Sequence, residues 1–289
     1  VEPLRYAHFP LCMYLLTQGL LGLVTDRALK RMGFRSFQTG RRGSLLWKYW
    51  LWEPPRAAAG DGPPVLFVHG VGVGLLPYAE IARTLQECGV PVLLLEVPFI
   101  SIKIAPEVPR AEDAVRALGA ILQYHGFEQV VCVGHSFGTV VLGWLWRYAP
   151  ERVAGLALLD PIVVLLFVHT VLYNFLYQKP ALLNPLDRIS SEFFLAHGLR
   201  RNFWWYECIL WPEDLPPSLP FLAILAEKDE IAPAPLVHRH LERTLASEAH
   251  SSVLLPGRSH GAICNDTEGI ATLRSFLRRA VRRVRDEEK

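Results

Sequence analysis

Short, almost wholly apolar runs alternate with amphipathic helical patterns along this chain, and that alternation constrains the fold more than any other feature. The apolar runs occupy residues 65–70, 90–97, 129–135, 153–160, 219–229 and 251–257. The helical patterns occupy residues 78–89, 110–126, 137–149, 235–246 and 268 onward. Strands that are apolar at successive positions must be buried on both faces, so we predict an α/β fold with a mostly parallel, doubly wound sheet.

Two segments depart from this rhythm and divide the chain. Residues 161–218 show no clear strand and are rich in Trp, Tyr and Phe, which indicates a helical cap inserted between two core strands. Residues 44–52 alternate weakly and are rich in aromatic side chains, as a strand would be. We therefore expect an N-terminal segment over 1–43, a core over 44–160 and 219–289, and a cap over 161–218.

The N-terminal segment contains an apolar stretch that is typical of a helix. The stretch from Tyr6 to Thr25 contains no Asp, Glu, Lys or Arg. It is followed at once by the basic residues Arg27, Lys30 and Arg31. This composition favours an apolar helix that lies in a membrane surface, with the basic residues at the headgroups. The alternatives are a helix packed on the domain and a membrane-spanning helix. Polar and glycine residues within the stretch make it less hydrophobic than a membrane-spanning helix usually is.

The five cysteines bear on the compartment in which the chain works. They form no C-x-x-C pair and show no zinc-ligand spacing. A disulfide framework is therefore not expected, and we expect an intracellular, reducing compartment with membrane association through the N-terminal segment. The chain begins with Val1 rather than Met, which leaves open whether a targeting segment precedes it.

The overall composition narrows the class of partner. At 51% hydrophobic and 20% charged residues, the chain has more apolar side chains than a core of this size needs, so some are expected to face lipid, an apolar ligand or a partner. The formal net charge of +2 provides no basic field, so nucleic acid is not an expected partner. We expect neither a metal ion nor a cofactor.

The strongest chemical signal is Gly134-His135-Ser136-Phe137-Gly138, which lies between an apolar run and a helical pattern. A serine there occupies a sharp strand-to-helix turn, where the glycines leave room for the backbone and the hydroxyl projects into the site. We therefore predict that Ser136 is a nucleophile and that His135 orients the turn. The alternative is a turn serine without a catalytic role.

A serine hydroxyl is a poor nucleophile without a base, and His260 is placed to act as one. It follows the last apolar run, in Ser259-His260-Gly261. A third residue should hold the imidazole tautomer and stabilise its cation. Asp229 ends the run 219–229 and is our preferred acid, whereas Asp160 ends the preceding run in the same way and is the alternative.

Two backbone N–H groups are expected to stabilise the developing oxyanion. Phe137 begins the helix after the nucleophile and is the first predicted donor. The second should come from the loop after the first core parallel strand, where we favour Val71, keep Gly72 as the alternative, and assign His69 and Gly70 a supporting role. A phosphate-binding loop is the competing interpretation, but the segment lacks a following Lys-Ser/Thr and the dinucleotide glycine spacing.

Together these residues resemble the α/β-hydrolase superfamily, in its serine lipase and esterase branch. The resemblance covers about residues 64–285 and rests on the HG loop, the GHSFG elbow, the DEIAP turn and SHG. It implies a lid after the sixth strand, where 161–218 lies, and the chain order Ser, Asp, His. Where many relatives carry an Asp-x-x-Gly-x-Gly turn, this chain has Glu96-Val97-Pro98-Phe99, which argues against close kinship with epoxide hydrolases.

We therefore expect a serine hydrolase that cleaves a carboxylic ester of an apolar, lipid-like substrate through an acyl-enzyme on Ser136. An aromatic-rich insertion favours an acyl chain over a sugar or a charged metabolite. Two alternatives stay open, an acyltransferase that uses the same acyl-enzyme and a non-catalytic ligand-binding protein of the same fold. The complete Ser, Asp and His set argues against the second of these.

Overall fold

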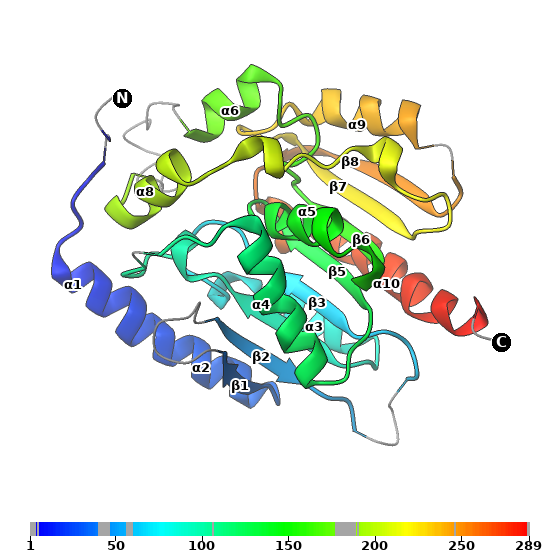
Figure 1. Ribbon diagram of the computed structural model, residues 1–289, viewed down its shortest axis with the longest axis horizontal. Coiled ribbons are helices and arrows are strands. Elements are labelled where there is room, and N and C mark those ends of the chain that lie inside the picture. Colours follow the sequence, from blue (N-terminus) through cyan, green and yellow to red (C-terminus); the bar gives the residue numbers. More distant parts are fainter. Residues whose placement is uncertain are drawn as a thin grey trace.

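The computed structural model describes residues 4, 6–39, 47–55, 60–105, 107–176, 189, 191–245 and 247–287, with side chains placed as far as residue 282 (Figure 1). In these ranges, eight strands form one sheet in the order β1-β2-β4-β3-β5-β6-β7-β8. The strands are β1 (Arg35–Gln38), β2 (Lys48–Trp52), β3 (Val65–Val68), β4 (Val92–Glu96), β5 (Val130–His135), β6 (Val153–Leu159), β7 (Phe221–Lys228) and β8 (His250–Ser259). β2 runs antiparallel to β1 and β4, whereas the six strands from β4 to β8 in sheet order are parallel. The predicted mostly parallel sheet is confirmed.

Helices cover both faces of this sheet. They are α3 (Ala79–Gln86), α4 (Ala111–Tyr124), α5 (Gly138–Tyr148), α9 (Ala234–Thr244) and α10 (Thr267–Glu287). In Figure 1, α4 and α5 lie on the near face and α3 and α10 on the far face. Along β3, Leu66 and Val68 enter one hydrophobic cluster, and Val65 and Phe67 enter the other. This burial on both faces is the reason why the strands read as unbroken apolar runs.

The N-terminal segment forms a helix in three consecutive parts. These are α1 (Leu11–Tyr14), a π-helical segment (Leu15–Leu21) and α2 (Gly22–Arg31). None of the helices in the described ranges is long and apolar enough to cross a membrane.

β1 was not predicted. It pairs with the outer edge of β2, with Arg35 opposite Leu51. The sequence analysis placed no strand before residue 44, because Arg35–Gln38 is short, largely exposed and contains a single apolar side chain. Residues 44–46 of the predicted strand 44–52 lie outside the described residues.

The segment between β6 and β7 has the helical character expected of residues 161–218. It contains α6 (His169–Leu176), α8 (Phe193–Arg201) and two short 3-10 turns, Trp205–Glu207 and Pro212–Asp214. The described part of this segment contains no strand. Residues 177–188 and 190 lie outside the described residues.

Candidate active site

Ser136 occupies the turn between β5 and α5, where the backbone is strained. Its φ is 52°, in the left-handed region that non-glycine residues seldom adopt. The flanking glycines let α5 pack closely on the sheet: a Cβ on Gly138 would lie 2.1 Å from the Val68 carbonyl oxygen, and one on Gly134 would lie 2.7 Å from a methyl carbon of Leu142. The turn therefore holds Ser136 at the end of β5, beside the first amides of α5.

Ser136, His260 and Asp229 lie together in one hydrogen-bonded chain. The Ser136 Oγ is 2.8 Å from His260 Nε2, and His260 Nδ1 is 2.7 Å from Asp229 Oδ2. A carboxylate only accepts, so His260 carries its proton on Nδ1 and donates it to Asp229, which leaves Nε2 as the acceptor for the Ser136 hydroxyl. In this tautomer the imidazole can take up the serine proton.

The surroundings of His260 favour its protonated form. Burial lowers the pKa of His260, but the hydrogen bond to Asp229 and the charges of the nearby carboxylates outweigh burial and raise the pKa above its ordinary value. Asp229 is held in place by the turn after β7, because its Oδ1 accepts hydrogen bonds from the N–H groups of Ile231 at 2.7 Å and Ala232 at 3.0 Å. The imidazole therefore has a carboxylate partner that is itself held in place by the backbone.

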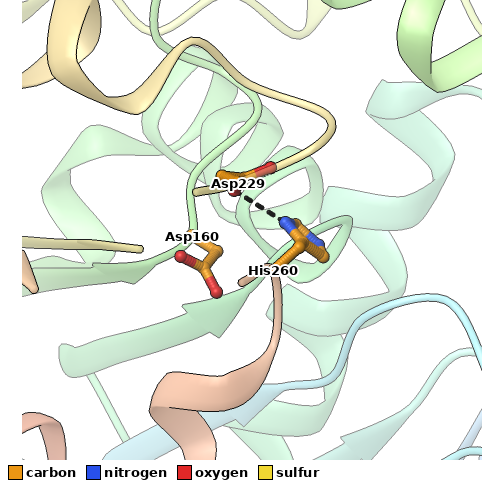
Figure 2. Close-up of side chains that lie close together, drawn as sticks. All are labelled: Asp160, Asp229 and His260. Carbon is orange, nitrogen blue, oxygen red and sulfur yellow. Dashed lines mark hydrogen bonds and ion pairs between the residues drawn. The ribbon is translucent and has the colours of Figure 1, made fainter. Parts of the chain in front are cut away.

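Asp160, the alternative acid, makes no hydrogen bond to the imidazole of His260 (Figure 2). Its two oxygens instead accept from the N–H groups of Ala226 at 2.9 Å and Gly261 at 2.7 Å. Burial raises the pKa of Asp160, but two neighbouring histidine rings and the Gly261 N–H lower it by more, so the buried carboxylate is charged. Asp160 thus ties the loop of His260 to β7, close to the turn of Asp229.

The same three side chains are also close enough to be considered as metal ligands. Oxygen and nitrogen atoms of Asp160, Asp229 and His260 lie within 4.8 Å of one another. Each group is already engaged, Asp229 with His260 and Asp160 with two backbone N–H groups. A metal ion would have to displace these hydrogen bonds, so the donor set suits an acid–base pair better than a metal centre.

The loop after β3 is held by the buried ring of His69. The Val97 N–H donates to His69 Nε2 at 3.0 Å, so the ring proton lies on Nδ1, which donates to the Gly70 carbonyl at 2.7 Å. Burial lowers the pKa of His69 to about 4, which keeps the ring neutral. The Gly72 N–H donates to the Ile100 carbonyl at 3.0 Å, so Gly72, the alternative oxyanion donor, is already occupied.

Val71 and Phe137, the two preferred donors, differ from Gly72 in this respect. Within the described ranges neither N–H group has a hydrogen-bond acceptor. Gly70 approaches Ser136 so closely that a Cβ on it would lie 2.9 Å from the Ser136 Cβ. The loop therefore lies against the serine turn, and the Val71 and Phe137 N–H groups, without an acceptor in the described part of the chain, are free to donate to a ligand oxygen.

A buried hydrogen-bond chain that the sequence analysis did not predict joins this loop to the elbow. The Gly70 N–H donates to the Tyr78 hydroxyl at 3.0 Å, and that hydroxyl donates to His135 Nδ1 at 2.8 Å. His135 Nε2 then lies 3.8 Å from Asp160 Oδ2, which is beyond hydrogen-bond distance, and burial lowers the pKa of His135 and favours the neutral ring. His135 was expected to orient the turn, but no sequence motif marks Tyr78 as its partner.

Aromatic side chains of the segment between β6 and β7 pack against the elbow. The Phe137 ring centroid lies 6.2 Å from that of Phe175 and 5.8 Å from that of Phe203, and these two are 5.5 Å apart. Phe99, after β4, lies 5.9 Å from Phe137. Five other aromatic side chains of the segment are exposed instead: Phe167, Tyr173, Trp205, Tyr206 and Trp211. The segment therefore packs apolar rings against Phe137, the residue after Ser136, while part of its aromatic content faces solvent.

Comparison with known proteins adds sequence and structural likenesses. A family model described as alpha/beta hydrolase fold matches residues 63–201. Lipase LipV of Mycobacterium tuberculosis is 51% identical over 51 residues, which make up 18% of this chain and only 20% of that lipase.

Solved structures resemble the chain over nearly its whole length. A membrane phospholipase A described as a bacterial virulence factor covers 93% of both chains with a TM-score of 0.62 at 19% identity. A carboxylesterase from Bacillus subtilis covers 90% of this chain and 98% of its own, with a TM-score of 0.61 at 13% identity. At these identities the likeness concerns the fold alone.

Proposed function

We propose that this chain, which has the α/β-hydrolase fold, is a serine hydrolase that cleaves a carboxylic ester of an apolar, lipid-like substrate through an acyl-enzyme on Ser136. The observation that carries the proposal is the unbroken chain from Ser136 Oγ through His260 to Asp229, at 2.8 and 2.7 Å. A serine that only shaped a turn would need neither a base at its hydroxyl nor an acid behind that base. The lipases and esterases among the similar proteins support a hydrolase of this general kind.

The acylation step follows from the positions of these groups. His260 Nε2 takes the proton of the Ser136 hydroxyl while Oγ forms a bond to the ester carbonyl carbon. The carbonyl oxygen becomes an oxyanion, which the Val71 and Phe137 N–H groups stabilise. The C–O bond to the alcohol then breaks, the alcohol leaves with the proton from His260, and the acyl group stays on Ser136.

Deacylation repeats these roles with water. His260 takes a proton from a water molecule whose oxygen attacks the acyl carbon, and the same two amides stabilise the second oxyanion. The bond to Ser136 Oγ breaks, the proton returns to the serine, and a carboxylic acid is released. Asp229 stays ionised throughout and stabilises the imidazolium in both steps.

The apolar nature of the substrate is inferred from the rings around the elbow. Phe99 and Phe137 are buried beside the elbow, and Phe175 and Phe203, which are partly exposed, pack on Phe137, so the surroundings of Ser136 are apolar. We assign residues 161–218 as the lid over this site, because two of these rings come from it. Since an apolar ester partitions into lipid, the enzyme is proposed to work at a membrane surface.

Hydrolysis of a series of p-nitrophenyl esters, from acetate through hexanoate to dodecanoate, tests the proposal. Turnover should rise with the length of the acyl chain, and Ser136→Ala should lower kcat on the order of a millionfold without changing the melting temperature. A variant that keeps more than about one percent of the wild-type activity, on protein free of other esterases, would contradict the assignment of Ser136. Adding an alcohol acceptor and measuring free acid against new ester separates hydrolysis from acyl transfer.

A further inference from the structure

The helix Leu11–Arg31 packs on the domain with its more polar side. Thr17 and Thr25 are 7% and 6% exposed and face the domain, together with Leu29 near the end of the helix. The outward side is largely apolar. Its large apolar residues, which we call the leucine face, are each 40% to 67% exposed: Leu11, Leu15, Leu16, Leu20, Leu23 and Val24. Cys12, Gln18 and Gly19 are also exposed on this helix. A helix on a domain that meets only water buries its apolar stripe, so this arrangement indicates that the leucine face has a partner of its own.

The π-helical segment Leu15–Leu21 is what brings the leucine face into one stripe. In an uninterrupted α-helix, residues eight apart, such as Leu15 and Leu23, lie about 80° apart around the axis. The i→i+5 hydrogen bonds of a π turn take up one extra residue and reduce this angle to about 20°. The same shift aligns Thr17 with Thr25 on the buried side, so both faces of the helix depend on the π segment.

Polar contacts hold the helix in this orientation. The Thr17 hydroxyl donates to the Ile102 carbonyl at 2.6 Å, and the Asp26 carboxylate pairs with Lys48 Nζ at 2.6 Å. Ile102 and Lys48 belong to the core, the first after β4 and the second on β2. Rolling the helix to bury its leucines would break both contacts, so the fold itself directs the leucine face outward.

The charge next to the leucine face matches a lipid bilayer with anionic headgroups. Arg27 lies four residues after Leu23, and Lys30 lies seven after it, so both continue the same side of the helix. Arg27, Lys30 and Arg31 are exposed, and no carboxylate in the described part of the chain forms an ion pair with them. Exposed leucines followed by basic residues are typical of a helix that lies in the plane of a membrane surface.

The same helix is joined to the segment 161–218. The buried carboxylate of Glu192 accepts hydrogen bonds from the N–H groups of Phe194 and Leu195 at the start of α8, at 3.0 and 2.9 Å. It also accepts a hydrogen bond from the Tyr14 hydroxyl, which lies on the N-terminal helix. A surface that binds the leucine face would therefore lie next to the segment whose rings flank the nucleophile, and Figure 1 places α8 beside the N-terminal end of this helix.

We propose that the leucine face docks on an anionic lipid bilayer and holds α8, through Glu192, at the membrane surface. This proposal names the surface on which the proposed esterase would act. It rests on the proposed function only where it assumes that lipid esters at that surface are hydrolysed. Binding needs no catalysis, so docking and hydrolysis can fail separately.

Vesicle flotation of the full chain tests the docking. Ser136→Ala serves as the parent, so that the lipids are not hydrolysed, and the vesicles are phosphatidylcholine with or without about one third phosphatidylserine. In this parent, Leu20→Glu/Leu23→Glu should lower binding to the mixed vesicles at least about tenfold. The matched control Tyr124→Glu/Leu236→Glu changes side chains that are 74% and 44% exposed on other helices, and it should float like the parent.

The outcomes separate docking from its competitors. Equal flotation of the parent and the leucine-face variant, or no flotation of the parent, would overturn the proposal. Light scattering that shows a dimer of the parent, lost in the leucine-face variant and without vesicle binding, would assign the face to a second copy of the chain instead. In a chain that keeps Ser136, Leu20→Glu/Leu23→Glu should hydrolyse soluble p-nitrophenyl acetate as fast as the wild type does. If the wild-type chain floats with vesicles but hydrolyses no ester, the proposed function is wrong and the docking stands.

Discussion

Replacing Asp229 or Asp160 with asparagine is expected to have different effects: the first should lower turnover, and the second should lower stability. Asp229 bonds the imidazole, whereas Asp160 bonds the backbone at Ala226 and Gly261. The pair Asp229→Asn and Asp160→Asn therefore separates loss of chemistry from loss of stability, with almost no change in side-chain volume.

Asp229→Asn should act on turnover. An asparagine can turn its NH2 group toward His260 Nδ1, which stabilises the tautomer that carries its proton on Nε2. That proton then faces the Ser136 Oγ, 2.8 Å away, and the ring cannot accept the serine proton. The same substitution in a serine protease lowers kcat by about four orders of magnitude, and we expect a loss of that order here. The remaining amide oxygen can keep the hydrogen bonds to the Ile231 and Ala232 N–H groups, so the fold should change little.

Asp160→Asn should act on stability. One of the two buried N–H groups, of Ala226 or Gly261, would then face an NH2 group instead of an oxygen. Leaving that donor unpaired costs about 1–3 kcal/mol, and the other N–H then bonds a neutral oxygen instead of a charged one, which costs about 1 kcal/mol more, so we expect a loss of about 2–4 kcal/mol in the free energy of unfolding. At about 2–4 °C per kcal/mol, Tm should fall by about 4–16 °C. Because His260 keeps its acid partner, kcat should fall no more than about tenfold.

Steady-state kinetics on a soluble p-nitrophenyl ester and thermal unfolding followed by circular dichroism measure the two effects on the same samples. Kinetics are run well below the Tm of each variant, so that unfolded protein does not lower the apparent kcat. The reasoning would be refuted if folded Asp160→Asn lost as much kcat as we expect of Asp229→Asn while Asp229→Asn stayed active. Asp160 would then be the acid.

Two further results are expected. Gly138→Ala should prevent the elbow from forming, because its Cβ would lie 2.1 Å from the Val68 carbonyl oxygen, and a folded, fully active Gly138→Ala protein would contradict that packing. The value of kcat/KM should fall as pH drops through the pKa of His260, because the protonated ring cannot take the serine proton. Asp229 is the main group that raises this pKa above 6.5, so the midpoint of the acid limb should lie above 6.5. The midpoint should move down in Asp229→Asn. A wild-type midpoint below 6.5 would show that this coupling is absent.

Local patterns in the sequence were enough to predict the sheet and to single out two of the site residues. Each core strand is buried on both faces, so its residues are apolar at successive positions, and this leaves a signal within a window of a few residues. The elbow at Ser136 is equally local, because its glycines are required by the packing of α5 on β3 and β5. His260 was singled out by its place after the last strand, which is again a feature of chain order.

Other features depend on contacts between distant segments, and only the tertiary structure decided them. Asp160 and Asp229 both end strands, so the sequence favoured Asp229 but left Asp160 as an alternative, and the 2.7 Å contact between Asp229 Oδ2 and His260 Nδ1 distinguishes them. Tyr78 has no motif, because its role comes from a hydrogen bond to His135, 57 residues away. β1 forms because the unpaired edge of β2 provides backbone hydrogen bonds for it. Its side chains are mostly polar and exposed, so its sequence does not predict a strand. The apolar content of the N-terminal helix was visible in the sequence, but the π segment and the polar contacts to the core determine which face that content occupies.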